Sequence, residues 1–214
     1  VINPGAAENA LIQIKLTFSD GIYSDFQYIE IIANPSFLNV DDNTITTSIA
    51  NTGRVGYDDP DNQRNGVGFV VNDNQLLFEM GLMMGTSSTD LYNNVRGINS
   101  GFDQDFVKTT PIKEIVPGLR STSEIFGSFS PSTLSTLLIS YRSLVMREAP
   151  NDRFVILEYT LKNTSAAAIT NFRFGVFADW DISDSGAKDA AGWNAGRQIG
   201  YVYPKQSTSL PHAG

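Results

Sequence analysis

The stretch NFRFGVFADWDISDSG, residues 171–186, alternates for ten residues and then places several acidic and hydroxyl groups within one turn. Side chains two positions apart share one face of a β-strand, so the alternation predicts a strand. Ala178 and Trp180 fall on one face of it, and Asp179 and Asp181 fall on the other. The strand is therefore expected to end at a polar site where two carboxylates lie side by side.

The rest of the chain repeats this pattern of short strands separated by turn residues. We expect strands at residues 10–18, 26–32, 44–53, 68–71, 75–85, 137–146, 154–161 and 198–203. Residues 86–135 are rich in Ser, Thr, Asn, Gly and Pro, which predicts long loops and edge strands, with a helix considered only for Ser132–Leu138. Because helices and strands do not alternate, the pattern indicates an all-β fold, an antiparallel β-sandwich with long loops.

Residues 1–38 form a predicted hairpin whose place in the fold has two interpretations. An Asp20-Gly21 turn signal joins its two strands, and Asn34-Pro35 punctuates the chain after it. The hairpin is either the end of a preceding immunoglobulin-like module or the first part of the main sandwich module, residues 39–214. The chain starts at Val1 rather than at methionine, which we interpret as an excised piece of a longer polypeptide.

Composition and charge exclude several classes of partner. The formal net charge is -8 and the pI is near 4.5, which argues against nucleic acid or an anionic membrane surface. The sequence contains no apolar run near the ~20 residues that span a bilayer, so membrane insertion is not expected. A charged fraction of 18% with abundant Ser, Thr, Asn and Gly is common in secreted β proteins, and it favours a secreted or cell-surface location.

Residue types that carry most hydrolytic chemistry are scarce. The chain has no cysteine, and its one histidine, His212, lies beside the C-terminal end, where chains usually fray. These two facts argue against thiol catalysis, a Ser-His-Asp triad and histidine metal sites. We therefore predict a protein that is not an enzyme and has no catalytic residues, and Ca²⁺ is the only cofactor that the sequence suggests.

Four oxygen-bearing residues near the end of the 171–180 strand resemble the ligands of a calcium loop: Asp179, Asp181, Ser183 and Asp184. Calcium prefers about six to eight oxygen ligands, which flexible acidic loops supply. The loop is not an EF-hand, because Ala190 stands where an EF-hand has its bidentate glutamate. In the alternative interpretation the carboxylates pair with Arg173 or accept hydrogen bonds from nearby backbone amides.

A second acidic loop, residues 57–68, offers Asp59 and Asp61 as further metal ligands. Loops of this composition are usually solvated turns, and Asn65-Gly66 is an ordinary turn signature. The sequence leaves both interpretations open.

Aromatic residues near the C-terminal end suggest a sugar-binding surface. Trp193, Tyr201 and Tyr203 can stack on sugar rings if they line an open face, because flat aromatic rings offer apolar area at a small entropic cost. Aromatic residues also fill the interiors of β-sandwiches. Solvent exposure of these rings distinguishes the two interpretations.

A glycosidase-like carboxylate pair is a further hypothesis. On a strand, the Cα atoms of Asp179 and Asp181 are about 6.5–7 Å apart, roughly within the carboxylate separations of glycoside hydrolases. An acid and a nucleophile usually come from different strands, so Glu158 is the candidate for the second carboxylate.

Two carboxylates, Glu79 and Glu158, lie in strongly apolar stretches. A buried carboxylate normally needs a charged partner, and Arg96 and Arg142 are the candidates. Such a pair is expected to be structural, although carboxylates with shifted pKa values also mark functional sites.

Three segments resemble, in the same order, a β-rich region of very large secreted bacterial proteins. The segments are NGVGFVVNDNQLLFEMGLMMG, DRFVILEYTLKNTS, and NFRFGVFADWDI with QIGYVY, and together the resemblance covers residues 40–204. In such proteins this region often follows a subtilisin-like protease domain and precedes adhesion or sorting modules. The resemblance implies export and an accessory role, and it carries no catalytic residue over to this chain.

The sequence therefore predicts a non-catalytic accessory or adhesion module of a secreted or cell-surface multidomain bacterial protein. Its expected partners are neighbouring domains of the same polypeptide and, in addition, a polysaccharide or a surface protein. The first alternative is a calcium-assisted carbohydrate-binding module that uses Trp193, Tyr201 and the acidic loop. The second alternative is a glycosidase-like hydrolase with paired carboxylates.

Overall fold

The computed structural model describes residues 6–59, 65–95, 103–183 and 186–205. Their secondary structure is nearly all β, with a short 3-10 turn at Gly186–Lys188 (η2), which confirms the predicted fold class. The chain divides into two compact units, Val1–Ser36 and Phe37–Gly214. A search of the described residues for a helix long and apolar enough to cross a membrane finds none.

The first unit is one long antiparallel hairpin. Strand β1 (Ala10–Ser19) pairs with β2 (Ser24–Ala33) over its full length, from Ala10 opposite Ala33 to Ser19 opposite Ser24. At the tip, the Asp20 carboxylate accepts hydrogen bonds from the backbone N–H groups of Ile22 and Tyr23 at 2.9 and 2.7 Å. Gly21 has a φ of 92°, a conformation that side chains disfavour, so the predicted Asp-Gly turn is confirmed.

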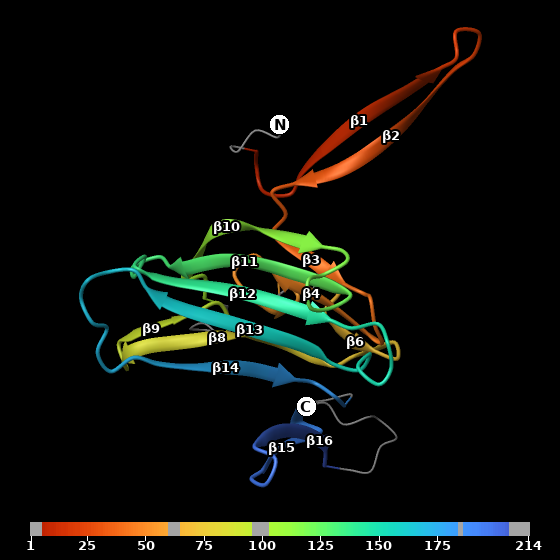
Figure 1. Ribbon diagram of the computed structural model, residues 1–214. Helices are drawn as coiled ribbons and strands as arrows, with labels where there is room; N and C mark the ends of the chain where they lie inside the picture. Colours follow the sequence, from red (N-terminus) through yellow and green to blue (C-terminus); the bar gives the residue numbers. More distant parts are fainter. Residues whose placement is uncertain (1–5, 60–64, 96–102, 184–185, 206–214) are drawn as a thin grey trace. The chain divides into compact units, whose positions relative to one another are not determined.

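The second unit is built from two main antiparallel sheets (Figure 1). The smaller sheet has four strands in the order β10 (Phe106–Ile115), β11 (Ser123–Pro131), β12 (Leu137–Val145) and β13 (Val155–Asn163). The larger sheet has the order β14 (Arg173–Trp180), β8 (Leu77–Ser87), β5 (Val55–Gly56), β4 (Ile45–Ala50), β6 (Phe69–Val71) and β7 (Asn74–Gln75). In addition, β3 (Phe37–Val40) pairs with β4, and β9 (Asp90–Asn93) pairs with β8. A separate two-stranded ribbon consists of β15 (Asp189–Asn194) and β16 (Ile199–Pro204).

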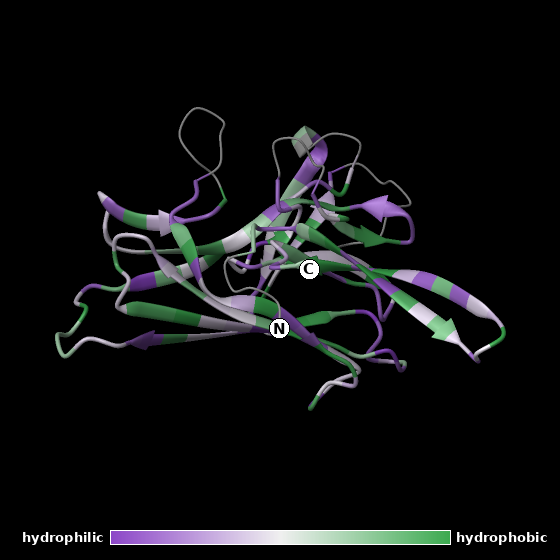
Figure 2. Ribbon diagram, turned by 90° about the horizontal axis from the view of Figure 1, so that it is seen from above, coloured by the Kyte–Doolittle hydropathy of each residue, from purple (hydrophilic) through white to green (hydrophobic). Residues whose placement is uncertain are grey.

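The core of the second unit lies between its two main sheets. Phe129 from β11 is fully buried and packs against the rings of Phe106 and Tyr141, with centroids 4.8 and 5.9 Å apart. On the larger sheet, the turn at Gly53 presses on the same ring, since a Cβ added there would lie 2.6 Å from Phe129 Cε1. The Tyr159 hydroxyl of β13 donates a hydrogen bond to the Gly53 carbonyl at 3.1 Å. Both contacts join the two sheets, and the apolar residues on the strands (Figure 2) supply the packing around them.

The expectation of long loops and edge strands for residues 86–135 is wrong for β11. This strand lies between β10 and β12 and is buried along almost its whole length. Its inward positions are Ile125, Gly127 and Phe129, and its outward positions include serines, so no run of large apolar residues marks it in the sequence. The neighbouring β10 is an edge strand, as expected, and Pro111 lies at the register shift between Thr110 and Lys113.

Two smaller expectations are also corrected. Residues 132–136 form a turn instead of a helix, and β12 begins at Leu137. No strand is expected between residues 181 and 197, but residues 189–194 form β15, whose Gly192 lies opposite Tyr201 of β16. A Cβ at Gly192 would lie 2.5 Å from the Tyr201 ring, so glycine is required there by the close approach of the ring and does not mark a loop.

The Phe129 packing gives a test of the core. Replacing Phe129 with alanine leaves a cavity between the sheets, and we expect a loss of about 3–5 kcal/mol in the free energy of unfolding. The matched control is Phe174→Ala in β14, whose side chain is 63% exposed, and here we expect a loss below about 1 kcal/mol. Urea denaturation followed by tryptophan fluorescence measures both values. Equal losses in the two variants would contradict the central place of Phe129.

Candidate functional site

An open cleft of about 660 Å³ lies between the two sheets of the sandwich. Its walls are mainly apolar and include Val155 and Leu157 from β13, Met80 from β8, and Phe69 and Trp180 from the larger sheet. Pockets of about 300–1,000 Å³ lined in this way are typical of sites that hold an apolar ligand group. The cleft is therefore the first candidate site.

Local sequence explains why the cleft is apolar. The alternation in β13 directs Val155 and Leu157 toward the opposite sheet, and Ile156 and Glu158 away from it. Trp180, at the end of β14, packs edge to face on Phe69, with ring centroids 5.3 Å apart and an interplanar angle of 87°. The described lining residues do not include Asp, Glu, His or Cys, so the cleft offers apolar contact rather than acid–base groups.

A single cationic side chain accompanies these apolar walls. Arg153 precedes β13 and lines the cleft, its side chain is 83% exposed, and its Nε lies 4.0 Å from the Asp152 carboxylate. An exposed pair at this distance contributes little to stability. Arg153 is therefore available to a negatively charged group that enters with an apolar ligand.

The predicted acidic site at the end of β14 has a different geometry from the one expected. Asp179 lies directly opposite Glu79 of β8, and Asp181 lies beyond the strand, with its N–H donating to the Leu76 carbonyl at 3.0 Å. Gly56 of β5 pairs with Glu79 and therefore shares its face, while Val55 points into the core. Arg54 lies two residues before Gly56, so strand alternation places it on the same outer face. The structure thus brings two carboxylates and one guanidinium to the outer face of the larger sheet.

The outer face is buried around Glu79 and Arg54. Glu79 and Arg54 are only 1% and 3% exposed. The chain after β9 covers the sheet here, since a Cβ added at Gly81 would lie 2.6 Å from Asn94 Oδ1. Asn94 in turn donates a hydrogen bond to the Thr52 hydroxyl at 2.8 Å. The signal for Glu79 was an acidic residue in an apolar stretch, whereas Arg54 carried no signal of burial.

The turn after β14 is held by the carboxylate of Asp189, which was not among the predicted ligands, and the predicted ligand Ser183 is one of its hydrogen-bond donors. The Ile182 N–H donates to Asp189 Oδ2 at 3.0 Å, and the Ser183 hydroxyl donates to the other oxygen of the same carboxylate. Asp184 lies outside the described residues. Within those residues, no group of three or more His, Cys, Asp or Glu side chains is arranged to hold a metal ion. Of the second loop, Asp59 is described and Asp61 is not.

The candidate sugar-binding aromatics lie on both faces of the β15–β16 ribbon. Trp193 is 64% exposed and lies opposite Gly200, whereas Tyr201 is 40% exposed and lies opposite Gly192. The alternation therefore puts these two rings on opposite faces. Tyr201 and Tyr203 share a face, with ring centroids 5.7 Å apart and an interplanar angle of 34°. The pair of neighbouring rings is thus formed by the two tyrosines and not by Trp193 with Tyr201.

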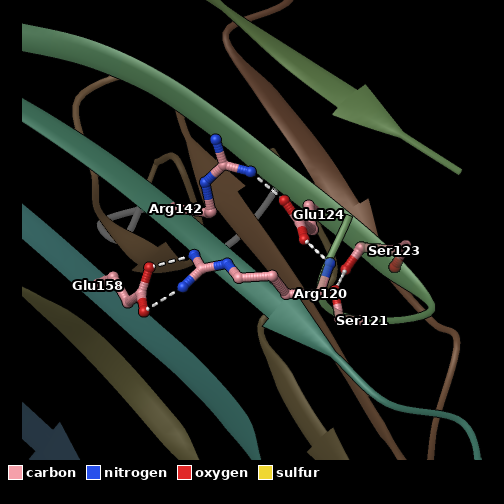
Figure 3. Close-up of polar contacts among 6 residues, drawn as sticks. All are labelled: Arg120, Ser121, Ser123, Glu124, Arg142 and Glu158. Carbon is pink, nitrogen blue, oxygen red and sulfur yellow. Dashed lines mark hydrogen bonds and ion pairs between the residues drawn. The ribbon is translucent and has the colours of Figure 1, made fainter. Parts of the chain in front are cut away.

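Ion pairs occupy the outer face of the smaller sheet (Figure 3). Arg120, from the β10–β11 connection, makes a two-pronged ion pair with Glu158, with Nη1 donating to Oε1 at 2.9 Å. Arg142 pairs with Glu124, which also accepts a hydrogen bond from the Arg120 backbone N–H at 2.6 Å. Arg96 and Arg142 were the candidate partners of Glu79 and Glu158. Arg96 lies outside the described residues, and Arg142 pairs with Glu124 and not with Glu158. Arg142 lies opposite Glu158 in register, but its guanidinium turns to Glu124 on the other side.

These contacts keep both glutamates ionised. For Glu124, burial is the largest influence and raises the pKa, but the Arg120 N–H and the Arg142 guanidinium together outweigh it, so the pKa lies below its ordinary value. The hydrogen bond from Arg120 is the largest influence on Glu158 and also lowers its pKa. A general acid needs a raised pKa, so neither glutamate has the shift that this role requires.

The structure does not bring the hypothetical glycosidase carboxylates together. Glu158 lies on the outer face of the smaller sheet, and Asp179 lies on the outer face of the larger sheet. Packed sheets are about 10 Å apart, so the two carboxylates are separated by the whole thickness of the sandwich. They cannot flank one glycosidic bond in this arrangement.

Comparisons with known proteins give no relative for this chain. No family model matches it, no curated protein matches it, and no solved structure matches it.

The Glu124 pair predicts a dependence of stability on pH. Because its pKa is lowered in the folded state, Glu124 contributes stability that is fully present above the unfolded pKa, about 4.3, and is lost as the pH falls through the folded value. Glu124→Gln leaves Arg142 without its buried partner, and we expect a loss of about 2 kcal/mol at pH 7 that shrinks below about pH 4. Urea denaturation at several pH values measures this difference.

The matched control is Glu158→Gln, which breaks the exposed ion pair with Arg120. We expect its unfolding midpoint at pH 7 to stay within measurement error, because exposed pairs are screened by solvent. The ionised Glu124 carboxylate does not stabilise the fold as we expect if both variants lose the same stability. The same conclusion holds if the loss in Glu124→Gln is unchanged at acid pH.

Proposed function

We propose that this chain is a non-catalytic accessory module of a secreted or cell-surface bacterial polypeptide, and that its inter-sheet cleft binds an apolar group of a partner. The observation that carries this proposal is the cleft itself, about 660 Å³ in volume with Trp180 and Leu157 in its walls. A cleft of this size accommodates one or two large apolar side chains. A binding role needs no reactive group in the cleft, and an enzyme would need one.

The placement of charge supports the non-catalytic part of the proposal. Glu158 and Glu124 are engaged by arginines, and Asp42 pairs with Arg147. A hydrogen bond from Ser123 is the largest influence on Asp42 and lowers its pKa, with Arg147 acting in the same direction. Carboxylates held ionised in this way stabilise the fold and are poor proton donors.

The partner that fits best is a neighbouring domain of the same polypeptide. A domain attached to this one meets the cleft at a high effective concentration, so a few apolar contacts suffice for binding. Arg153 adds a preference for an apolar segment that carries an acidic residue. The resemblance of residues 40–204 to the accessory region of large secreted proteins, and the surface rich in Ser, Thr, Asn and Gly, support export.

An apolar fluorescent anion, anilinonaphthalene sulfonate, is a direct probe of the cleft. We expect the native chain to bind it and Val155→Phe to weaken binding about tenfold, equivalent to about 1.4 kcal/mol, because the larger side chain fills part of the cleft. The same substitution at Val176, an exposed position of β14, is the matched control and should leave the affinity unchanged. Fluorescence titration measures the affinities, and circular dichroism checks that both variants are folded.

Equal binding by the two variants would place the dye elsewhere and would remove the support for the cleft. Loss of binding in Val155→Phe with an unchanged unfolding midpoint would support binding of the dye in the inter-sheet cleft. Arg153→Ala should weaken binding of this anion further without changing stability, because Arg153 is exposed.

A second candidate function is calcium-assisted binding of carbohydrate. Exposure of Trp193 and Tyr201 favours it, as does the pair of neighbouring rings formed by Tyr201 and Tyr203. Aromatic rings that remain in solvent after folding are available for stacking on sugars. The acidic end of β14, with Asp179 and Asp181, is the place that we propose for Ca²⁺ in this candidate function.

Depletion of the chain by insoluble polysaccharides, with Ca²⁺ and with a chelator, tests this second candidate. If it holds, the chain is retained only with Ca²⁺, and Tyr201→Ala abolishes retention because the tyrosine pair is lost. Phe174→Ala removes an exposed ring of another strand and should leave retention unchanged. If the chain is not retained under either condition, the carbohydrate proposal is contradicted. The proposal that the cleft binds an apolar group does not depend on this result.

A further inference from the structure

Strand β14 is an edge strand whose centre carries neither charge nor proline. It pairs with β8 on one side, and within the described residues no strand pairs with its other side. The centre of β14 reads FGVFA, and its charged residues, Arg173 and Asp179, stand at the two ends of its regular ladder with β8. Edge strands normally carry lysine, other charges or proline, because these residues hinder pairing with another chain.

The other edge strands of the sandwich have such features. The edge strand β10 carries Lys108 and Pro111, and the edge strand β13 carries Glu158 and Lys162. At the other edge of the larger sheet, β3 is only four residues long. β14 is therefore the long edge of the sandwich that is suited to accept a further strand.

The described residues of the first unit supply no strand to this edge. Strands β1 and β2 pair only with each other, and the chain then enters the sandwich at Phe37, the first residue of β3. β3 pairs with β4 at the edge of the larger sheet opposite to β14 (Figure 1). A strand that pairs with β14 therefore comes from outside the described part of the chain.

Two apolar side chains of β14 lie on the inward side of the larger sheet and remain exposed. Phe174 and Val176 share this side with Ala178, which packs on the core, yet they are 63% and 57% exposed. A strand added beside β14 would cover part of both side chains. The free edge therefore offers apolar contact as well as backbone hydrogen bonds.

The sequence of β14 is complementary to itself when two copies run antiparallel. If Val176 lies opposite Val176 of a second copy, Arg173 lies opposite Asp179, and Phe174 lies opposite the small Ala178. Opposite charges that face each other across a strand pair stabilise it. Within one copy, Arg173 and Asp179 are six residues apart, or about 20 Å along the strand, so they do not pair with each other.

Gly175 supports the same register. In this register Phe177 of the second copy lies opposite Gly175, and a Cβ added at Gly175 would meet no atom within 4 Å. The chain already contains a ring over a cross-strand glycine, since a Cβ at Gly192 would lie 2.5 Å from the Tyr201 ring. Covering a strand glycine with an aromatic ring is a known way to stabilise a strand pair. A pocket of about 400 Å³ beside Gly175 has room for the ring.

We propose that the free edge of β14 pairs with the same edge of a second copy of this chain, antiparallel and centred on Val176, so that one sheet continues through both copies. A two-fold axis makes each contact occur twice. A carboxylate accepts several hydrogen bonds, so Asp179 accepts from Arg173 of the second copy in addition to its contacts within its own copy. This proposal does not depend on what the inter-sheet cleft binds.

The size of the edge places this pairing among weak, transient interfaces. Seven residues at about 3.3 Å each and a sheet about 10 Å thick give an edge of roughly 230 Å² per copy, and stable interfaces bury about 1,200 Å² or more in total. We therefore expect dimers at submillimolar protein concentration and monomers in dilute solution.

Single cysteines test the register, because the chain has no cysteine of its own. In the proposed pair, position 176 faces itself with Cβ atoms about 4.5–5.5 Å apart, close to the reach of a disulfide. Position 174 is displaced from its own equivalent by four residues, or about 13 Å. Under a mild oxidant at submillimolar concentration, Val176→Cys should form cross-linked dimers at least about tenfold faster than the similarly exposed Phe174→Cys.

Charge reversal tests the pairing of Arg173 with Asp179. Sedimentation at about 0.15 M salt, which screens the repulsion between copies of net charge -8, should show a dimeric mass at high concentration. Arg173→Asp and Asp179→Arg should each weaken dimerisation about tenfold, because each places like charges opposite each other. An equimolar mixture of the two variants should dimerise again, because opposite charges then face each other at both ends of the strand pair.

A matched pair of lysine variants locates the interface and does not involve Asp179. Val176→Lys places two ammonium groups at the two-fold axis and should reduce dimerisation at least about tenfold. Val107→Lys makes the same change at an exposed position of the edge strand β10 and should leave dimerisation unchanged. Circular dichroism checks that each variant is folded.

Three results would overturn the proposal. Equal rates of cross-linking for the two cysteine variants would contradict the register. Equal effects of the two lysine variants would place the interface away from β14. A monomeric mass at every concentration, with slow cross-linking of Val176→Cys, would show that a second copy does not occupy this edge.

Discussion

The structure of the second unit depends on the burial of Phe129 between the two sheets. Its ring lies under the Gly53 turn, where a side chain on residue 53 would clash with it, and Tyr159 donates a hydrogen bond to the carbonyl of the same turn. Protein interiors are close-packed, so this contact sets both the spacing and the lateral alignment of the sheets. The remaining inward residues of β8, β12 and β13 fill the space that it defines.

The same packing explains where charge is found. The ion pairs of Glu124 and Glu158 lie outside the smaller sheet, and Glu79, Asp179 and Arg54 lie outside the larger one. Charges in the space between the sheets would be desolvated without compensation, so that space is left apolar. Where the strands no longer cover each other, the apolar space opens as the cleft. The apolar character of the cleft therefore follows from the way in which the sandwich excludes charge.

Alternation of large apolar residues made β12, β13 and β14 predictable, because side chains two apart must share a face. The same rule failed for β11, whose inward glycine and outward serines give no contrast, and for the small residues of β15. Glu158 was correctly expected to need an arginine, but the partner is Arg120, which lies in a loop 38 residues earlier in the chain. Local patterns do not determine which of several arginines reaches a carboxylate.

By itself the sequence determined the all-β class, the long N-terminal hairpin with its Asp20-Gly21 turn, and the acidic end of β14, since each depends on residues close together in the chain. Only the tertiary structure decided that Glu79 is the cross-strand neighbour of Asp179, that Trp193 and Tyr201 face opposite ways, and that a cleft opens beside Trp180. These features depend on which distant strands pair and in which register. Backbone hydrogen bonds between strands are the same for every residue type, so the local pattern leaves that choice to packing.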